Sequence, residues 1–135
     1  MNLFSITPVG ILISRAEELV KETYPDLLNI ISYEIESYIP QKAYDLGGQT
    51  VDGVYDEETK TIYLHTNSLL ETALHEIGHA VHYQIFNADD LELPVKDKVK
   101  EHNHKEVFAE AFKDSILNEI KTERDKKIIE LIKAI

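Results

Sequence analysis

The 135-residue sequence contains no cysteine, which excludes disulfide scaffolds, cysteine-ligated zinc sites, iron–sulfur clusters and thiol nucleophiles. No apolar run approaches the ~20 residues that a membrane-spanning helix needs. Basic residues are also few, because 14 Lys and Arg stand against 25 Asp and Glu, for a net charge of -11. Binding to nucleic acid or to an anionic membrane is therefore not expected, and a basic peptide or protein is the better partner.

Internal repeats, low-complexity tracts and Pro/Gly/Ser-rich linkers are missing as well. With 43% apolar and 29% charged residues, the composition is that of a folded globular chain. We therefore expect residues 1–135 to form a single domain. The first 14 residues have no basic residue before their apolar part and no clear cleavage site. This predicts that they belong to the fold and that the protein is cytoplasmic.

The order of the sequence patterns predicts an α+β fold with a mixed front half and a helical back half. Apolar spacing and Pro, Gly and acidic turn signals mark the elements. The expected elements are a helix starting at Thr7-Pro8 (or at Ser14) and ending at Pro25, a short helix from Asp26, a strand over 34–39, a hairpin of strands over 49–55 and 60–65, and helices over 69–86, 106–117 and 121–135.

The helix over 69–86 has the strongest signals. Ser68 followed by Glu71 has the spacing of a capping box, which predicts that Ser68 is the N-cap. An apolar stripe at helical spacing follows and predicts the buried face. Its members are Leu70, Leu74, Ile77, Val81 and Ile85. In contrast, His82 is expected to be a partly exposed residue of this helix, the alternative being that it orients His79 or a water.

A His-Glu-x-x-His motif lies in the middle of this helix, at residues 75–79. Because residues four apart lie on one helix face, the imidazoles of His75 and His79 can bind one metal ion. Glu76 can then act as general base on a water whose pKa a zinc ion lowers. Gly78 leaves room for another segment to approach closely. The alternative reading is a surface helix with incidental histidines.

A catalytic zinc site needs a third protein ligand. Ile85 stands where one class of zinc proteins has a third histidine, and Tyr83 stands where a ligand would lie one turn after His79, so both positions are excluded. Glu106 and Glu110 lie on the next predicted helix, one turn apart, and face the same way. One of them can bind the metal while the other hydrogen-bonds a histidine ligand.

Together, the motif at 75–79 and the segment Glu-Val-Phe-Ala-Glu-Ala-Phe at 106–112 resemble the peptidase domain of anthrax toxin lethal factor and its relatives, which include bacterial Pro–Pro endopeptidases. The resemblance is best over residues 53–117. It implies a zincin-like fold, one Zn²⁺ per chain and endopeptidase activity on a peptide or protein. It also implies that Glu106 is the third ligand and that Glu110 supports a histidine. In the family an edge strand binds extended substrate, which here corresponds to 49–55 or its hairpin partner.

The chain departs from this family at one functional position. The family has a tyrosine seven residues before the glutamate ligand, where it is thought to stabilise the oxyanion, and this chain has Val99. His102 and His104 are the nearby replacements. His102 precedes Glu106 by four residues, so a longer helix would bring it to the same face, and we name it as a candidate catalytic residue. The alternative is that both are loop histidines and that activity is weak or absent.

Three functional hypotheses follow from these patterns. The first is a zinc-dependent endopeptidase with Glu76 as general base. The second, which the missing tyrosine motivates, is a weakly active or inactive member of the same fold that binds and regulates a partner. The third is a different zinc hydrolase, against which the match around Glu106 argues. The sequence does not predict the substrate, the cleaved bond or the oligomeric state.

Overall fold

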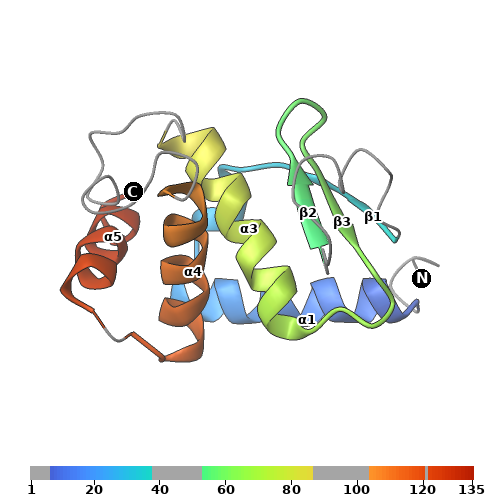
Figure 1. The fold of residues 1–135 in the computed structure, drawn as a ribbon, viewed down its shortest axis with the longest axis horizontal. Coiled ribbons are helices and arrows are strands. Elements are labelled where there is room, and N and C mark those ends of the chain that lie inside the picture. Colours follow the sequence, from blue (N-terminus) through green and yellow to red (C-terminus); the bar gives the residue numbers. More distant parts are fainter. Residues whose placement is uncertain (1–6, 38–52, 87–103, 121) are drawn as a thin grey trace.

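The computed structural model describes residues 7–37, 53–86, 104–120 and 122–135. It contains helices and a small mixed sheet, so the expected α+β class is confirmed (Figure 1). The elements are α1 (Pro8–Thr23), the 3₁₀ helix η2 (Leu27–Asn29), β1 (Glu34–Glu36), β2 (Gly53–Asp56), β3 (Thr61–Leu64), α3 (Leu70–Ile85), α4 (His104–Leu117) and α5 (Glu123–Lys133). No helix in these ranges is long and apolar enough to cross a membrane.

Helix α1 begins at the first of the two expected positions. The side chain of Thr7 accepts a hydrogen bond of 2.9 Å from the backbone N–H of Gly10, and Pro8 occupies the first helical turn. Such a cap satisfies a donor that the helix itself leaves unpaired, and proline fits there because it has no N–H to satisfy. Ser14 therefore lies inside the helix, which ends at Thr23, two residues before Pro25.

The sheet has the strand order β1-β3-β2, with β1 parallel and β2 antiparallel to β3. Residues 57–60 form the hairpin turn, where Lys60 has a φ of 53°. The predicted strands were longer, but 38–39 and 49–52 lie outside the described residues. In this order β2 is an edge strand of the sheet, and Figure 1 shows it on the side that faces α3.

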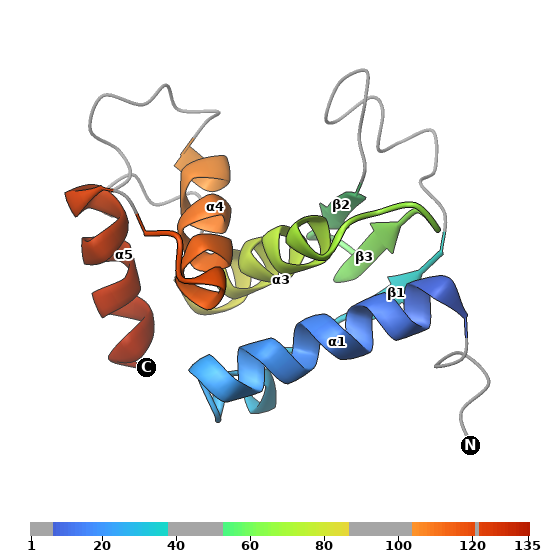
Figure 2. The ribbon, with the colours of Figure 1, turned by 90° about the horizontal axis from the view of Figure 1, so that it is seen from below.

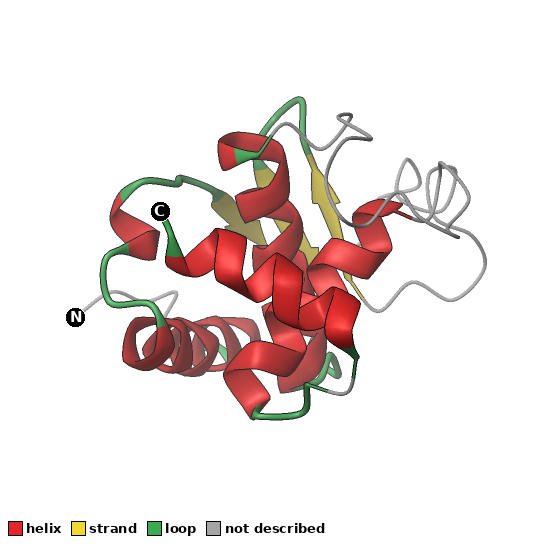
Figure 3. Ribbon diagram, turned by 90° about the vertical axis from the view of Figure 1, so that its left-hand side faces the viewer, coloured by secondary structure: helices red, strands yellow, loops and turns green. Residues whose placement is uncertain are grey.

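Helix α3 occupies the centre of the molecule, with the sheet on one side and α4 on the other. Helix α1 runs beneath α3 and the sheet, and α5 lies outside α4 (Figures 1 and 2). Helices account for most of the described chain, as Figure 3 shows. Leu74, Ile77 and Val81 of the predicted stripe are fully buried, while Leu70 and Ile85 are partly buried against the core. The His-Glu-x-x-His motif is thus carried by a largely buried helix.

Two local predictions were wrong. Ser68 is not the N-cap of α3: Leu69 takes that position, without a side-chain hydrogen bond. The Ser68 hydroxyl instead accepts a hydrogen bond of 2.9 Å from the backbone N–H of His65, so it stabilises the turn after β3. The last helix, expected over 121–135, ends at Lys133, so Ile135 lies beyond it and is 48% exposed, whereas Ile128 and Ile132 are buried.

Candidate metal centre

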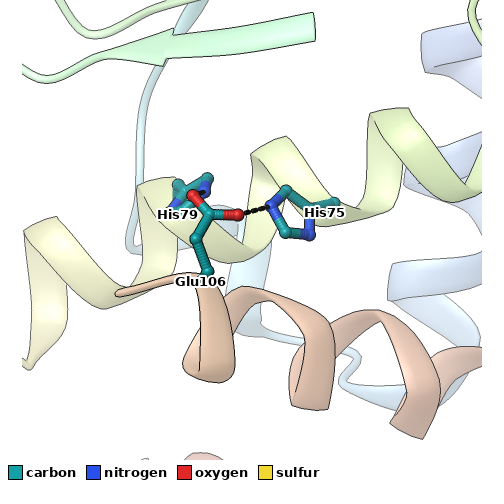
Figure 4. A group of neighbouring side chains, drawn as sticks. All are labelled: His75, His79 and Glu106. Atoms are coloured by element: carbon teal, nitrogen blue, oxygen red, sulfur yellow. Dashed lines mark hydrogen bonds and ion pairs between the residues drawn. The ribbon is translucent and has the colours of Figure 1, made fainter. Parts of the chain in front are cut away.

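His75 and His79 project from one side of α3, one turn apart (Figure 4). Their side chains are 14% and 10% exposed, so both rings are largely enclosed and each keeps a small exposed area. The sequence spacing alone predicts this shared face. The Nδ1 atom of His79 is buried and has no hydrogen-bond partner among the described residues.

Glu106, in the first turn of α4, supplies the third group. Its Oε2 atom lies 2.8 Å from Nε2 of His75, and its Oε1 atom lies 3.0 Å from Nε2 of His79 (Figure 4). One ligand atom from each of the three side chains falls within 4.8 Å of the others, so the group could hold a metal ion. In a tetrahedral zinc site, ligand atoms bonded at ~2.0–2.1 Å are about 3.3 Å apart, a separation that falls within the 4.8 Å limit of this group.

The close contact between α3 and α4 that brings these ligands together depends on Gly78. A Cβ atom at this position would lie 3.0 Å from Cα and 3.1 Å from the carbonyl O of Ala109, and 3.2 Å from Cβ of Phe112. Glycine is therefore the residue that lets the two backbones approach so closely. The predicted role of Gly78, room for another segment, agrees with this packing.

Glu110 contacts the other nitrogen of His75. Its Oε1 atom lies 2.6 Å from Nδ1 of His75, in an ion pair whose angle departs from that of a hydrogen bond. Its Oε2 atom lies 2.7 Å from Nζ of Lys113. The placement of Glu106 at Nε2 and of Glu110 at Nδ1 distinguishes the two glutamates, which the sequence pattern alone did not. Lys113 was missed, although its spacing of three residues from Glu110 was a usable signal.

Glu76 lies beside the ligands but faces the sheet. It is 6% exposed, and a Cβ atom built on Gly53 of β2 would lie 3.3 Å from its Cγ atom. Burial raises the pKa of Glu76, and the charges of Glu106 and Glu110 act in the same direction against the opposing effect of the histidines. A carboxyl group with a raised pKa, next to a potential metal site, is suited to accept and release a proton.

The three side chains that could hold a metal ion influence one another's pKa values. Contacts with His75 and His79 hold the pKa of Glu106 far below its usual range. Burial acts to lower the pKa of His75, but its contact with Glu106 and the nearby charges of Glu76 and Glu110 outweigh burial and raise it. The imidazole therefore holds a proton more tightly in this environment. Because a metal ion must displace that proton, metal binding should be favoured by higher pH.

His82 does not belong to this constellation. It is fully buried, and its ring stacks on Phe108 of α4 with centroids 4.1 Å apart. The expectation of a partly exposed residue was wrong because α4 covers this side of α3. Val99 and His102 lie outside the described residues, so the proposed substitution for the family tyrosine stays a prediction. His104 is the first residue of α4.

A hollow lies past the histidines along α3, where the end of that helix meets β2 and the segment before β1. Tyr83 lies one turn after His79, and its ring packs on that of Tyr55 with centroids 5.7 Å apart. Gln84, which sequence reasoning missed, bonds both the N–H and the carbonyl of Ser32 and the hydroxyl of Tyr55. These residues line an open hollow of about 570 Å³. The Gln84 amide thus links α3 to β2 and to the segment before β1.

Comparisons of the chain with protein-family models, with curated proteins and with solved structures found no match. Functional inference therefore depends on the site itself. That site comprises two imidazoles and a carboxylate at metal-binding spacing, a buried carboxyl group beside them, and an edge strand next to the same helix.

Proposed function

We propose that this protein is a zinc-dependent endopeptidase with a zincin-like fold. The observation that carries the proposal is the convergence of Nε2 of His75 and Nε2 of His79 on the Glu106 carboxylate, which arrives from a separate helix. The resemblance of residues 75–79 and 106–112 to the lethal factor peptidase family supports the same reading. Two histidines with one glutamate are the ligand set of several zinc hydrolases.

The donor set fits zinc better than a hard cation such as Mg²⁺ or Ca²⁺, because two of its three donors are imidazole nitrogens. His75, His79 and Glu106 would hold the ion. Glu106 is 58% exposed, so the site is open to solvent on the side from which a substrate would arrive. A bound zinc ion would polarise the scissile carbonyl and the attacking water.

Glu76 would carry the proton transfers of the reaction. Its carboxylate takes the proton of the attacking water and then gives it to the amide nitrogen of the leaving group. Its position next to His75 in sequence, but on the sheet side of α3, keeps it within reach of the metal without making it a ligand. Burial, which raises its pKa, makes the carboxylate a stronger base and so favours the first of these transfers.

The substrate would bind as an extended segment along β2, the edge strand beside α3. Backbone hydrogen bonds to an edge strand hold many sequences equally well, so they suit a peptidase. The net charge of -11 favours a basic segment, and a cleavage screen should start with basic peptides. A partner-binding role without cleavage is the second candidate function, because Val99 replaces the family's tyrosine.

Metal analysis of protein purified without added metal tests the proposal most directly. We expect about one zinc per chain in the wild type and almost none in His75→Ala. His65→Ala is the matched control, because His65 follows β3 and is not among the three ligands. Well-folded wild-type protein that holds no metal, even after incubation with Zn²⁺, would refute the metal site and the peptidase reading with it.

Alanine substitutions of the two glutamates should differ in their effect on zinc affinity. Glu106→Ala removes a ligand and is expected to weaken zinc binding by more than the roughly 10–100-fold typical of groups that support a ligand. Glu110→Ala removes no ligand, but it takes away the contacts with Nδ1 of His75 and with Lys113, and its effect should fall within that range. Competition with a chromogenic chelator measures the zinc affinity of each variant. The reverse order would mean that Glu110 is the ligand.

A further inference from the structure

On the side of His75 that faces away from Glu106, charged contacts connect its ring to a glutamate and then to a lysine. Nδ1 of His75 lies 2.6 Å from Oε1 of Glu110, and the second oxygen of that carboxylate lies 2.7 Å from Nζ of Lys113. The ammonium group also lies 3.3 Å from Oδ1 of Asp114. Glu110 is thus held at both oxygens, one by the histidine and one by the lysine.

The two partners of this ion pair differ in exposure. The side chain of Glu110 is 50% exposed, whereas that of Lys113 is only 16% exposed. A half-exposed glutamate on a helix has several accessible rotamers, and ordering it costs conformational entropy. A lysine whose stem is packed and whose charge is less screened by water can select one of those rotamers.

We infer that Lys113 is a positioning residue of the metal site, which acts through Glu110. By binding one oxygen of Glu110, Lys113 keeps the other oxygen at Nδ1 of His75. This 2.6 Å contact limits the rotation of the imidazole and favours a proton on Nδ1, which leaves the lone pair of Nε2 for the ion. The inference rests on the proposed metal-binding function, and it adds a residue that none of the sequence patterns assigned.

The direction of the effect separates positioning from simple electrostatics. Lys113 carries a positive charge near a cation site, so its removal should strengthen metal binding if charge alone matters. If Lys113 orders Glu110 and thereby His75, its removal should weaken metal binding instead. The two roles therefore predict changes of opposite sign in the same measurement.

The test compares Zn²⁺ affinities, measured by chelator competition on the full chain, for Lys113→Met and Lys113→Arg. We expect Lys113→Met to bind zinc about tenfold more weakly, at the low end for groups that support a ligand. Lys113→Arg should stay close to the wild type, because it keeps the charge and can reach Glu110. The absorption spectrum of the Co²⁺-loaded protein should change only in Lys113→Met, since it reports ligand geometry.

Lys126→Met is the matched control. Lys126 makes the same kind of pair, three residues along a helix, with Glu123 of α5 at 3.1 Å, and this pair does not lead to the metal site. The variant should bind zinc like the wild type. In a Glu110→Ala background, Lys113→Met should cause no further loss of zinc affinity, because Lys113 acts through that carboxylate.

Three outcomes would overturn the inference. Equal or tighter zinc binding by Lys113→Met, while the wild type binds zinc, would refute the positioning role and leave the metal site intact. An additive loss in the Glu110→Ala background would show that Lys113 does not act through Glu110. A wild type without zinc affinity would remove the metal site, and the role of Lys113 would fail together with the proposed function.

Discussion

Glu76→Gln is expected to retain zinc and to lose peptide cleavage by roughly 10²–10⁴-fold, the range that a general acid–base contributes. Glutamine has the shape of glutamate, so the packing of this buried side chain against β2 is preserved. Its amide cannot accept the proton of the attacking water or deliver one to the leaving nitrogen. Cleavage of a peptide identified in the screen, with metal content measured on the same sample, checks both parts.

The same variant should not be less stable than the wild type. Burial raises the pKa of Glu76, so the folded chain binds this proton more tightly than the unfolded chain. Stability must therefore fall as the pH rises from the ordinary carboxyl value through the raised pKa. Glutamine carries no charge and escapes this loss. Urea unfolding of the metal-free proteins at neutral pH should place Glu76→Gln level with the wild type or above it.

Glu71→Gln provides the control for this pair of measurements. Glu71 lies on the same helix and is exposed, so its replacement should change neither cleavage nor metal content. Cleavage retained by Glu76→Gln to within a few-fold would contradict the role of Glu76 as general base. Loss of zinc in that variant would instead indicate that Glu76 is itself a ligand.

The sequence predicted α3 and the shared face of its two histidines because both depend on spacing within one helix. His75 and His79 share a face at four residues apart, and the buried stripe of Leu74, Ile77 and Val81 fixes which side is enclosed. The role of Gly78 could also be predicted, because a glycine among apolar residues in a helix indicates that a neighbouring segment packs closely there. Local geometry was sufficient at these positions.

Relations between separate elements could not be predicted in the same way. The burial of His82 depends on where Phe108 of α4 lies, and the distinction between Glu106 and Glu110 depends on the rotation of α4 about its axis. Ser68 matched a capping pattern, yet its hydroxyl is used by the preceding turn. Gln84 bonds Ser32, 52 residues earlier, which no local pattern signals.

Gly78→Ala is expected to weaken zinc binding at least about tenfold, because the ligands lie on the two helices that this glycine brings together. The added Cβ would lie 3.0 and 3.1 Å from backbone atoms of Ala109, which can move only if α4 moves. Such a shift displaces Glu106, three residues earlier on α4, from the two histidines of α3. Chelator competition measures the change in affinity.

The effect on folding should be smaller than the effect on the metal site. Overpacking costs about 1–3 kcal/mol, while alanine in place of glycine inside a helix recovers about 1 kcal/mol. The net loss in the free energy of unfolding is therefore about 0–2 kcal/mol. Urea unfolding in the presence of a chelator measures this change in the free energy of unfolding without a contribution from bound metal. The variant should remain folded.

Gly53→Ala is the matched comparison, because the Cβ added there meets side chains and not backbone. Its nearest neighbours would be Cγ2 of Thr72 at 2.9 Å, Cδ2 of Leu64 at 3.0 Å and Cγ of Glu76 at 3.3 Å. Zinc affinity should survive, since no ligand is displaced, but cleavage should fall because Glu76 is pushed aside. Equal zinc affinities for Gly78→Ala and the wild type would contradict the idea that the α3–α4 contact sets the ligand geometry.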